Sequence, residues 1–147
     1  RHFASKAQMF EALIDFIESS VFGLIGQITE REPDGRTQAA RIVAMVLQFG
    51  ERNPGMARVM AGDALVLEHE RLQQRMNQLF DKLEAALRQG LRTAAAGGPA
   101  TPTPDADAQV TASVLAAFTA GRLQRFARSG FRRAPTEQLD ACIARML

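Results

Sequence analysis

Residues 10–28, Phe-Glu-Ala-Leu-Ile-Asp-Phe-Ile-Glu-Ser-Ser-Val-Phe-Gly-Leu-Ile-Gly-Gln-Ile, decide the fold of this chain. Apolar residues recur there at intervals of three and four: Phe10, Leu13, Ile14, Ile17, Val21, Leu24, Ile25 and Ile28. At about 100° per residue, this spacing puts them in one stripe of an α-helix that faces a core. Ser5 suits an N-cap, so we expect the first helix to run from about Ser5 to Glu30.

The other periodic segments also have the helical repeat, and the chain has no Tyr or Trp to cover a sheet. We expect helices over about 37–52, 54–61, 63–95 and 106–128, and a last one opened by Pro135 and Thr136. The segment 97–106 is rich in Gly, Pro and Thr, and it predicts a flexible linker. The sequence therefore predicts an all-α fold, an antiparallel bundle of about six helices.

Composition and the first residues bound the organisation of the chain. Its 147 residues suit one domain, the net charge is +2, and the single Cys142 has no partner for an internal disulfide. A reducing cytoplasm is therefore expected. There is no initiator Met and no signal-peptide pattern, and residues 1–3 resemble the end of a short helix. We expect residues 1–4 to be the remnant of a preceding DNA-reading domain and 5–147 to be a body that dimerises and binds a partner.

The outward faces of the first two predicted helices suggest a partner site. Met9 and Phe16 point about 100–120° away from the centre of the core stripe. On the second helix, a shared face lies about 120–180° from its core stripe and carries Arg41, Met45, Gln48 and Arg52. If the two faces adjoin, they form a groove with an apolar floor and a basic rim, and Asn53 lies at its mouth. Such a groove suits a short peptide with apolar and acidic residues.

Catalytic and metal-binding patterns are absent from the sequence. His2 and His69 are far apart and lie in no zinc-binding pattern, and Cys142 falls on an apolar helix face. We therefore expect no enzyme activity, no metal and no cofactor. The basic run from Arg122 to Arg133 is open to two interpretations: contact with DNA or an acidic partner, or stabilisation of a helix C-terminus.

Several segments resemble a known family. They are Arg-His-Phe-Ala-Ser-Lys-Ala-Gln-Met-Phe at 1–10, Leu-Ile-Asp-Phe-Ile-Glu at 13–18, Phe-Gly-Glu-Arg-Asn-Pro-Gly at 49–55, Glu-Arg-Leu-Gln at 70–73, Asn-Gln-Leu-Phe at 77–80 and Arg-Phe-Ala-Arg-Ser-Gly-Phe at 125–131. Together they resemble the C-terminal body of TetR-type regulators and, among these, the nucleoid occlusion factors. The resemblance covers nearly the whole chain and weakens at 93–108.

The resemblance implies a dimer, formed through the last two helices, that binds double-stranded DNA through an N-terminal domain. It also implies that the protein inhibits the division protein FtsZ by binding its C-terminal tail. Phe16, Arg52 and Asn53 match the family's tail-binding pattern, whereas Met45 and Gln48 depart from an expected Leu and Gly. His2 and Lys6 match positions near the DNA backbone.

Alternatives remain at each of these positions. Ser5 can be only a cap and Lys6 only solvated, and Phe16 can pack against the short helix at 55–61 or the preceding domain. A ligand-responsive repressor with a small-molecule pocket in the helical body is the alternative function. The predicted helix seams are uniformly apolar and include no polar cluster, which favours the peptide-binding adaptor.

Overall fold

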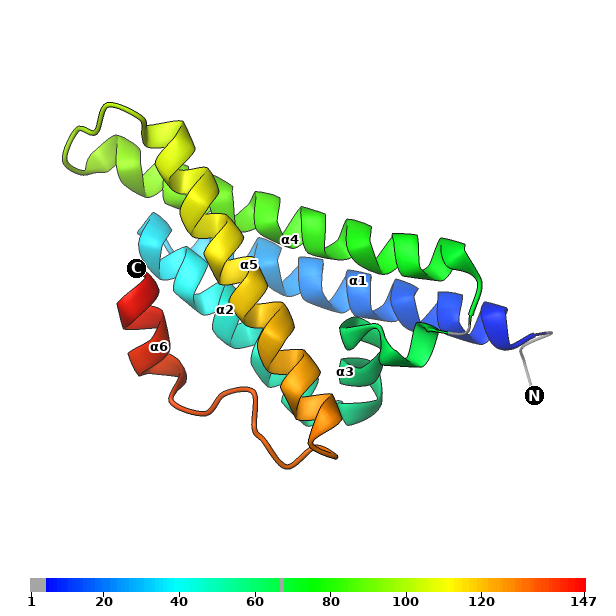
Figure 1. Cartoon of the computed structure of the whole chain (residues 1–147). Helices are drawn as coiled ribbons and strands as arrows, with labels where there is room; N and C mark the ends of the chain where they lie inside the picture. The colour runs from blue at the N-terminus through cyan, green and yellow to red at the C-terminus, as the bar shows by residue number, and fades with distance from the viewer. Residues whose placement is uncertain (1–4, 67) are drawn as a thin grey trace.

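The structure, a computed structural model, describes residues 5–66 and 68–147 (Figure 1). The described residues form six α-helices, a single 3-10 turn and no strand, which confirms the predicted all-α fold. The elements are α1 (Lys6–Arg31), α2 (Gly35–Arg52), α3 (Pro54–Ala61), η1 (Asp63–Leu65), α4 (Glu70–Gly97), α5 (Pro104–Arg128) and α6 (Leu139–Met146).

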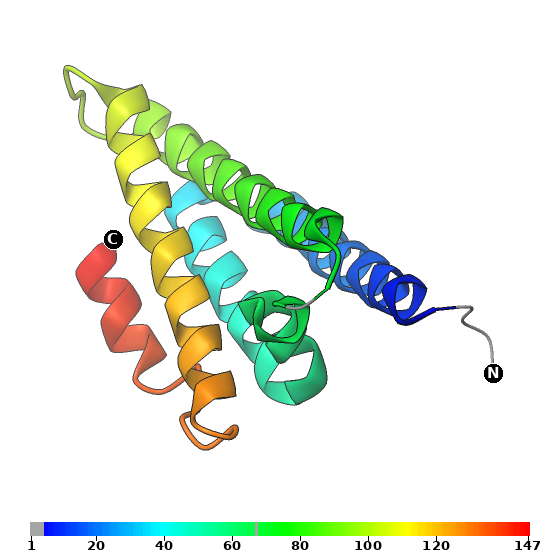
Figure 2. The same ribbon diagram turned by 45° about the vertical axis from the view of Figure 1, so that its right-hand side comes forward.

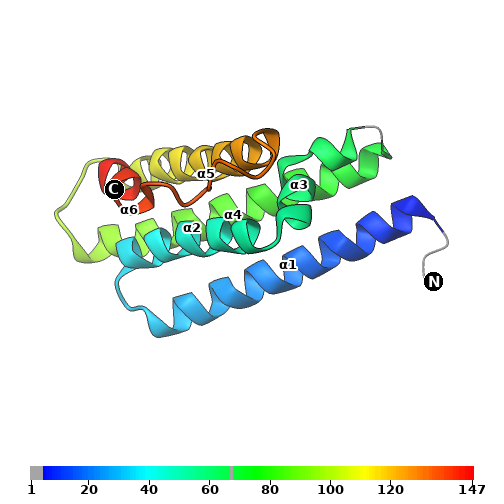
Figure 3. The ribbon, with the colours of Figure 1, turned by 90° about the horizontal axis from the view of Figure 1, so that it is seen from below.

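The helices are stacked in three layers. Seen from below, α1 forms one outer layer, α2 and α4 lie in the middle, and α5 with α6 forms the opposite outer layer (Figure 3). The turned view shows α5 running alongside α2, with α6 on the other side of α5 at the edge of the molecule (Figure 2). Helix α1 makes its main contacts with α2, α3 and α4.

Local chemistry explains where the first two helices begin. The Ser5 hydroxyl accepts a hydrogen bond from the Gln8 amide at 3.1 Å, as its predicted N-cap role requires. The Asp34 carboxylate accepts from the Thr37 amide at 3.0 Å and from the Thr37 hydroxyl at 2.6 Å. These hydrogen bonds to the carboxylate, first from the hydroxyl and then from the amide, lower the pKa of Asp34. Helix α2 therefore starts at Gly35, two residues before the predicted Thr37.

The middle of the bundle is closely packed. Ile14, Ile17 and Val21 from α1 are fully buried, and so are Leu79 and Leu87 from α4. The first turn of α2 meets α4 backbone to backbone, because a Cβ on Gly35 would lie 2.1 Å from the Gly90 carbonyl oxygen. The two helices can approach this closely only while position 35 has no side chain.

Several predicted boundaries were wrong. The long helix begins at Glu70 instead of 63, because Gly62 takes a left-handed conformation and residues 63–65 form a separate 3-10 turn. The helix predicted from 106 begins at Pro104, whose fixed φ suits a first helical position. The non-helical connection therefore covers only 98–103, shorter than the predicted linker 97–106. Residues 135–138 form turns, and α6 starts after Gln138 at a positive φ of 51°.

Candidate peptide-binding site

Phe16 lies on the outer surface of α1. Its side chain is 51% exposed, whereas the next residue, Ile17, is completely buried. The prediction that Phe16 points away from the core is therefore confirmed. An aromatic side chain that is exposed to water lacks the stabilisation that burial would give. Phe16 is therefore a candidate for contact with a partner.

The two sides of α1 are not equally free. On the side facing α4, Arg71 pairs with Glu11 at 3.1 Å, and Arg75 pairs with Asp15 at 2.7 Å and Glu18 at 2.9 Å. Partial burial lowers the pKa of Arg75, but the hydrogen bonds to the two carboxylates outweigh it and the pKa is raised. These ion pairs hold α1 to α4, and the side with Phe16 is the one left open.

A hollow of about 580 Å³ lies on this open side, between α1 and the start of α3. Its lining residues are Phe10, Leu13, Arg52, Asn53, Pro54, Gly55, Met56, Arg58, Val59 and Ala64. Phe16 follows Leu13 by about one helical turn on α1, but it does not itself line the hollow. The hollow combines apolar side chains with two exposed guanidinium groups, those of Arg52 and Arg58.

Hydrogen bonds to the last turn of α2 hold Asn53 in place. Its side-chain amide donates to the Phe49 carbonyl at 2.8 Å, and its main-chain N–H bonds to the carbonyls of Phe49 and Gly50. The residue therefore ends α2 and fixes the turn into α3. None of the described groups donates to its Oδ1 atom, which remains available at the edge of the hollow.

The structure brings together only some of the other residues predicted for the groove. Met9 and Met45 are half-buried and pack against the core, so the expectation that they point outward was wrong. Both lie on outward faces of their helices, but their long flexible side chains reach neighbouring apolar surface. Arg41 lies about 16 Å along the helix from Arg52 and pairs with Glu32 at 3.3 Å.

Gln48 is exposed and lines a smaller hollow, of about 180 Å³, on another side of α2. Glu51, Arg52 and Thr136 complete that hollow, and the Thr136 hydroxyl donates to Glu51 at 2.5 Å. Arg52 is thus shared between two neighbouring depressions. Of the residues predicted for the groove, Arg52 and Asn53 line the larger hollow, and Phe16 lies outside its lining.

Leu24 was assigned to the core from its spacing, and that assignment was wrong, because its side chain is 37% exposed. It follows Phe16 by eight residues on α1, so the two share a face of the helix. The signal was present in the sequence: Leu24 lies at the edge of the apolar stripe, beyond the arc that one neighbouring helix covers. The exposed apolar surface of α1 therefore extends past Phe16 toward the end of the helix.

At the start of the chain, Lys6 is exposed and pairs with Glu68 at 3.1 Å. Its ammonium lies 6.0 Å from the centre of the Phe10 ring. His2, the other position predicted to approach DNA, lies outside the described residues. Lys6 is thus paired within the chain, and the carboxylate of Glu68 competes with any DNA phosphate for its ammonium group.

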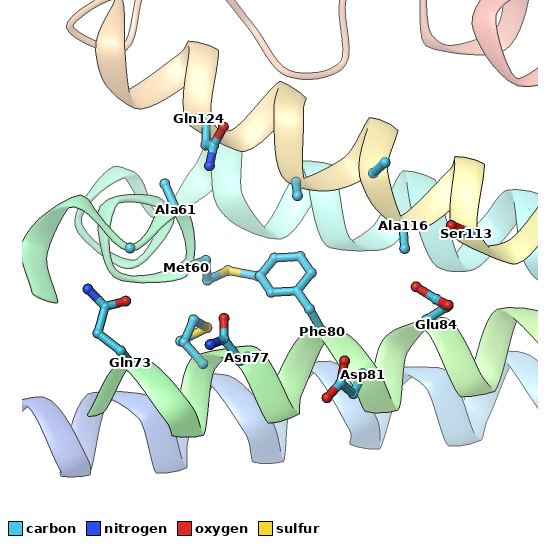
Figure 4. Close-up of a pocket in the computed structure, with 14 residues that line it drawn as sticks. Met60, Ala61, Gln73, Asn77, Phe80, Asp81, Glu84, Ser113, Ala116 and Gln124 are labelled. Atoms are coloured by element: carbon cyan, nitrogen blue, oxygen red, sulfur yellow. The ribbon is translucent and has the colours of Figure 1, made fainter. Parts of the chain in front are cut away.

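Another hollow, of about 440 Å³, opens between α3, α4 and α5 (Figure 4). Phe80 projects into its centre, and Asp81 and Glu84 lie on its α4 side. The two buried polar side chains in the described part are Gln38 and Thr119. Both bond to nearby main-chain carbonyls, Gln38 to that of Glu32 and Thr119 to that of Leu115. Neither directs a free polar group at this hollow.

Among the described residues, none of the helices combines the length and the apolar composition that a membrane span requires. Within the same residues, no three His, Cys, Asp or Glu side chains gather as a metal site would require.

Comparison with known proteins places the fold in a class. The family described as "Tetracyclin repressor-like, C-terminal domain", of SlmA-like type, matches residues 34–146. A nucleoid occlusion factor SlmA from Salmonella typhi is 47% identical over 141 residues, which is 96% of this chain and 70% of that protein. The SlmA of Citrobacter koseri is 46% identical over 144 residues, with the same coverage. The chain belongs to the SlmA-like family, and the resemblance found in the sequence is confirmed.

Proposed function

We propose that this chain is the partner-binding body of a nucleoid occlusion factor. In this role the protein is associated with the nucleoid through DNA and inhibits assembly of the division ring over it. The relatives of the chain carry the name of that function. The observation that supports a partner-binding role in this chain is the exposed ring of Phe16, about one helical turn from Leu13, which lines a hollow with a basic edge.

The proposed ligand is the C-terminal tail of FtsZ. An extended peptide with apolar and acidic residues complements this surface, because apolar side chains cover Phe16, Leu13 and Met56 while carboxylates meet the guanidinium groups of Arg52 and Arg58. The Oδ1 atom of Asn53 accepts a hydrogen bond from the peptide backbone in this arrangement. Ordering a flexible peptide costs free energy, so the affinity is expected to be modest.

The same proposal includes a homodimer, formed through the last two helices, and double-stranded DNA bound by a preceding domain. A dimer presents two copies of the peptide surface. Two tails on neighbouring FtsZ molecules then bind more tightly than one, because the second binding event is intramolecular.

The ligand-responsive repressor is less well supported. A small-molecule pocket requires polar groups that converge on an internal cavity. The hollow between α3, α4 and α5 opens to the surface, and the two buried polar side chains of the described core are satisfied by main-chain carbonyls.

The test is a fluorescence-anisotropy titration of a labelled FtsZ tail peptide with this chain. Phe16→Ala and Arg52→Asp should each weaken binding by about tenfold or more, since central aromatic and arginine residues carry most of the energy of such interfaces. Phe22→Ala, on the α4 side of the same helix, and Arg31→Asp, at its end, are the matched controls. If all four variants bound the tail peptide with the same affinity, the proposed peptide site would be refuted.

A further inference from the structure

The end of α5 and the segment that follows it carry a concentration of positive charge. Residues 121–136 contain five arginines and no Asp or Glu. The net charge of the whole chain is only +2, so the residues outside this segment are negative in sum. A segment whose charge opposes that of the rest of the chain points to a polyanionic partner.

Two of the five arginines are used within the chain. Arg122 donates to the carbonyls of Pro135 at 3.0 Å and Glu137 at 2.6 Å. Its guanidinium also lies 4.7 Å from the centre of the Phe118 ring. Arg133 pairs with Glu137 at 3.3 Å. These contacts attach the segment after α5 to the helix.

The other three arginines are free of such contacts. Arg125, Arg128 and Arg132 are exposed, and none of them forms an ion pair with a residue that the structure describes. Arg125 and Arg128 lie in the last turn of α5, where positive charge complements the helix dipole. That effect falls off within the turn, so it gives no role to Arg132, which follows the end of the helix.

Hydrogen bonds hold the turn after α5 in a fixed shape. The Ser129 hydroxyl donates to the Phe126 carbonyl at 3.0 Å. It also accepts hydrogen bonds from the main-chain N–H groups of Arg132 at 3.2 Å and Arg133 at 2.9 Å. Phe131 has a positive φ of 66°, and its ring packs edge-on against Phe126 with 5.1 Å between the ring centres. The two arginines of the turn are therefore carried by a preorganised backbone.

We call Arg125, Arg128, Arg132 and Arg133 the basic corner, and it lies toward the end of the bundle where the chain begins. Helix α5 runs toward the end at which α1 starts (Figures 1 and 3). Its last part packs on the end of α2, because a Cβ on Gly50 would lie 2.5 Å from a methyl carbon of Leu123. The adjoining α2–α3 turn and the start of α1 border one hollow. In the proposed function, a DNA-binding domain precedes α1, so its duplex passes this end of the molecule.

We propose that the basic corner binds the phosphate backbone of double-stranded DNA, as a second contact beside that of the preceding domain. This inference rests on the DNA association of the proposed function and adds a DNA surface to the helical body itself. Arginine suits the role because its planar guanidinium makes two parallel hydrogen bonds to one phosphate. Phosphate contacts carry no sequence information, so the corner adds affinity and fixes the orientation of the body on the duplex.

The shape of the basic corner favours DNA over an acidic polypeptide. An extended peptide requires a groove with pockets for its side chains, such as the hollow between α1 and α3. The hollow at the corner has a volume of about 60 Å³ and is lined by Arg122, Arg125, Arg133, Ala134 and Glu137. This is about twice the volume of one water molecule in the liquid, so it accommodates a phosphate group but no peptide segment. The carboxylate of Glu137 is already paired with Arg133.

The test is the salt dependence of binding between the 147-residue chain and a fluorescently labelled DNA duplex of arbitrary sequence. The double substitution Arg128→Gln and Arg132→Gln should weaken binding by about tenfold at low salt. It should also reduce the slope of log Kd against log salt concentration by about 1.8, because each phosphate contact contributes about 0.9.

The double substitution Arg31→Gln and Arg88→Gln is the matched control. It removes the same charge from two exposed arginines for which the described residues offer no ion pair, and Arg31, like Arg128, lies in the last turn of its helix. The control should keep the affinity and the slope of the unsubstituted chain. Equal losses in the two double variants would mean that only net charge matters, which overturns the inference, as does a chain that does not bind the duplex even at low salt.

Two further measurements separate the inference from its alternatives. If polyglutamate binds as tightly as the duplex and loses affinity in the Arg128→Gln and Arg132→Gln variant, the partner is an acidic polypeptide and the inference is wrong. The titration with the FtsZ tail peptide tests the proposed function separately, because neither arginine lines the hollow between α1 and α3. A failed tail titration together with the expected change of slope refutes the peptide site and leaves the DNA contact supported.

Discussion

Phe16 and Ile17 are neighbours on α1, yet they belong to two different regions of the molecule. Ile17 lies in the close-packed core with α2 and α4. Packing there is so close that a methyl group in place of a hydrogen on Gly35 would clash with the backbone of α4. Phe16 lies on the open face of α1, where about half of its surface is exposed. The contrast shows that the apolar residues of this chain serve two purposes, stability in the core and recognition on the surface. Substitutions can separate them.

The largest effect is expected from Ile17→Ala. The side chain is completely buried, so its loss leaves a cavity and should lower the free energy of unfolding by about 3 kcal/mol. Phe16→Ala should change it by less than about 0.5 kcal/mol. Urea denaturation followed by circular dichroism measures both values. Similar losses for the two variants would mean that Phe16 belongs to the core.

A second large effect is expected at the α2–α4 contact. A Cβ on Gly35 would lie 2.1 Å from the Gly90 carbonyl oxygen and 2.7 Å from the Ala94 amide nitrogen, and backbone atoms cannot move aside cheaply. Gly35→Ala should therefore lower the free energy of unfolding by about 2 kcal/mol.

Gly26→Ala is the matched control for that substitution. Gly26 lies on the exposed side of α1, away from its ends, and a Cβ there would meet no atom within 4 Å. The change should raise stability by about 0.5 kcal/mol, because alanine favours the helix. If Gly35→Ala and Gly26→Ala changed the melting temperature by the same amount, the close backbone contact between α2 and α4 would be contradicted.

A smaller effect is expected from the ion pairs that attach α1 to α4. Arg75→Ala removes contacts to Asp15 and Glu18, and because the arginine is partly exposed the loss should be about 1 kcal/mol. The difference from the unsubstituted chain should shrink in concentrated salt, which screens such pairs. Arg31→Ala, for which the described residues offer no ion-pair partner, should have no measurable effect.

The smallest effect is a pH dependence at the start of α2. The folded state lowers the pKa of Asp34 below its unfolded value. Its contribution is therefore present above the unfolded pKa, near 3.8, and is lost as the pH falls through the folded pKa. Asp34→Ala should lower the melting temperature at neutral pH, and the difference should close in strong acid. A difference that grows on acidification would contradict the cap.

The regular part of this fold could be predicted from the sequence, because a repeat of three and four residues specifies a helix and its buried face. Ile14, Ile17 and Val21 were assigned correctly on that basis. The break at Gly62 was predicted, but the 3-10 turn that follows it and the late starts of α4 and α6 were not, because the periodicity does not encode such local backbone geometry.

The site was predictable only where one helix decides it. Phe16 lies far from the centre of the core stripe, and its side chain is exposed as that position predicts. Met9 and Met45 also lie on outward faces, but their long side chains bend onto neighbouring apolar surface. Leu24 lies at the edge of the stripe, and its exposure depends on how much of that edge the neighbouring helices cover. The hollow beside Phe16 depends on where α3 packs, which follows from the turn at Asn53 and could not be derived from spacing.

The most direct test of this contrast is amide hydrogen–deuterium exchange of the chain, free and saturated with the FtsZ tail peptide. Peptide binding should slow exchange at residues 13–24 of α1 and 48–58 around the α2–α3 turn, with little change in α4 and α5. Slower exchange confined to 73–84 and 113–124, around the hollow between α4 and α5, would contradict it.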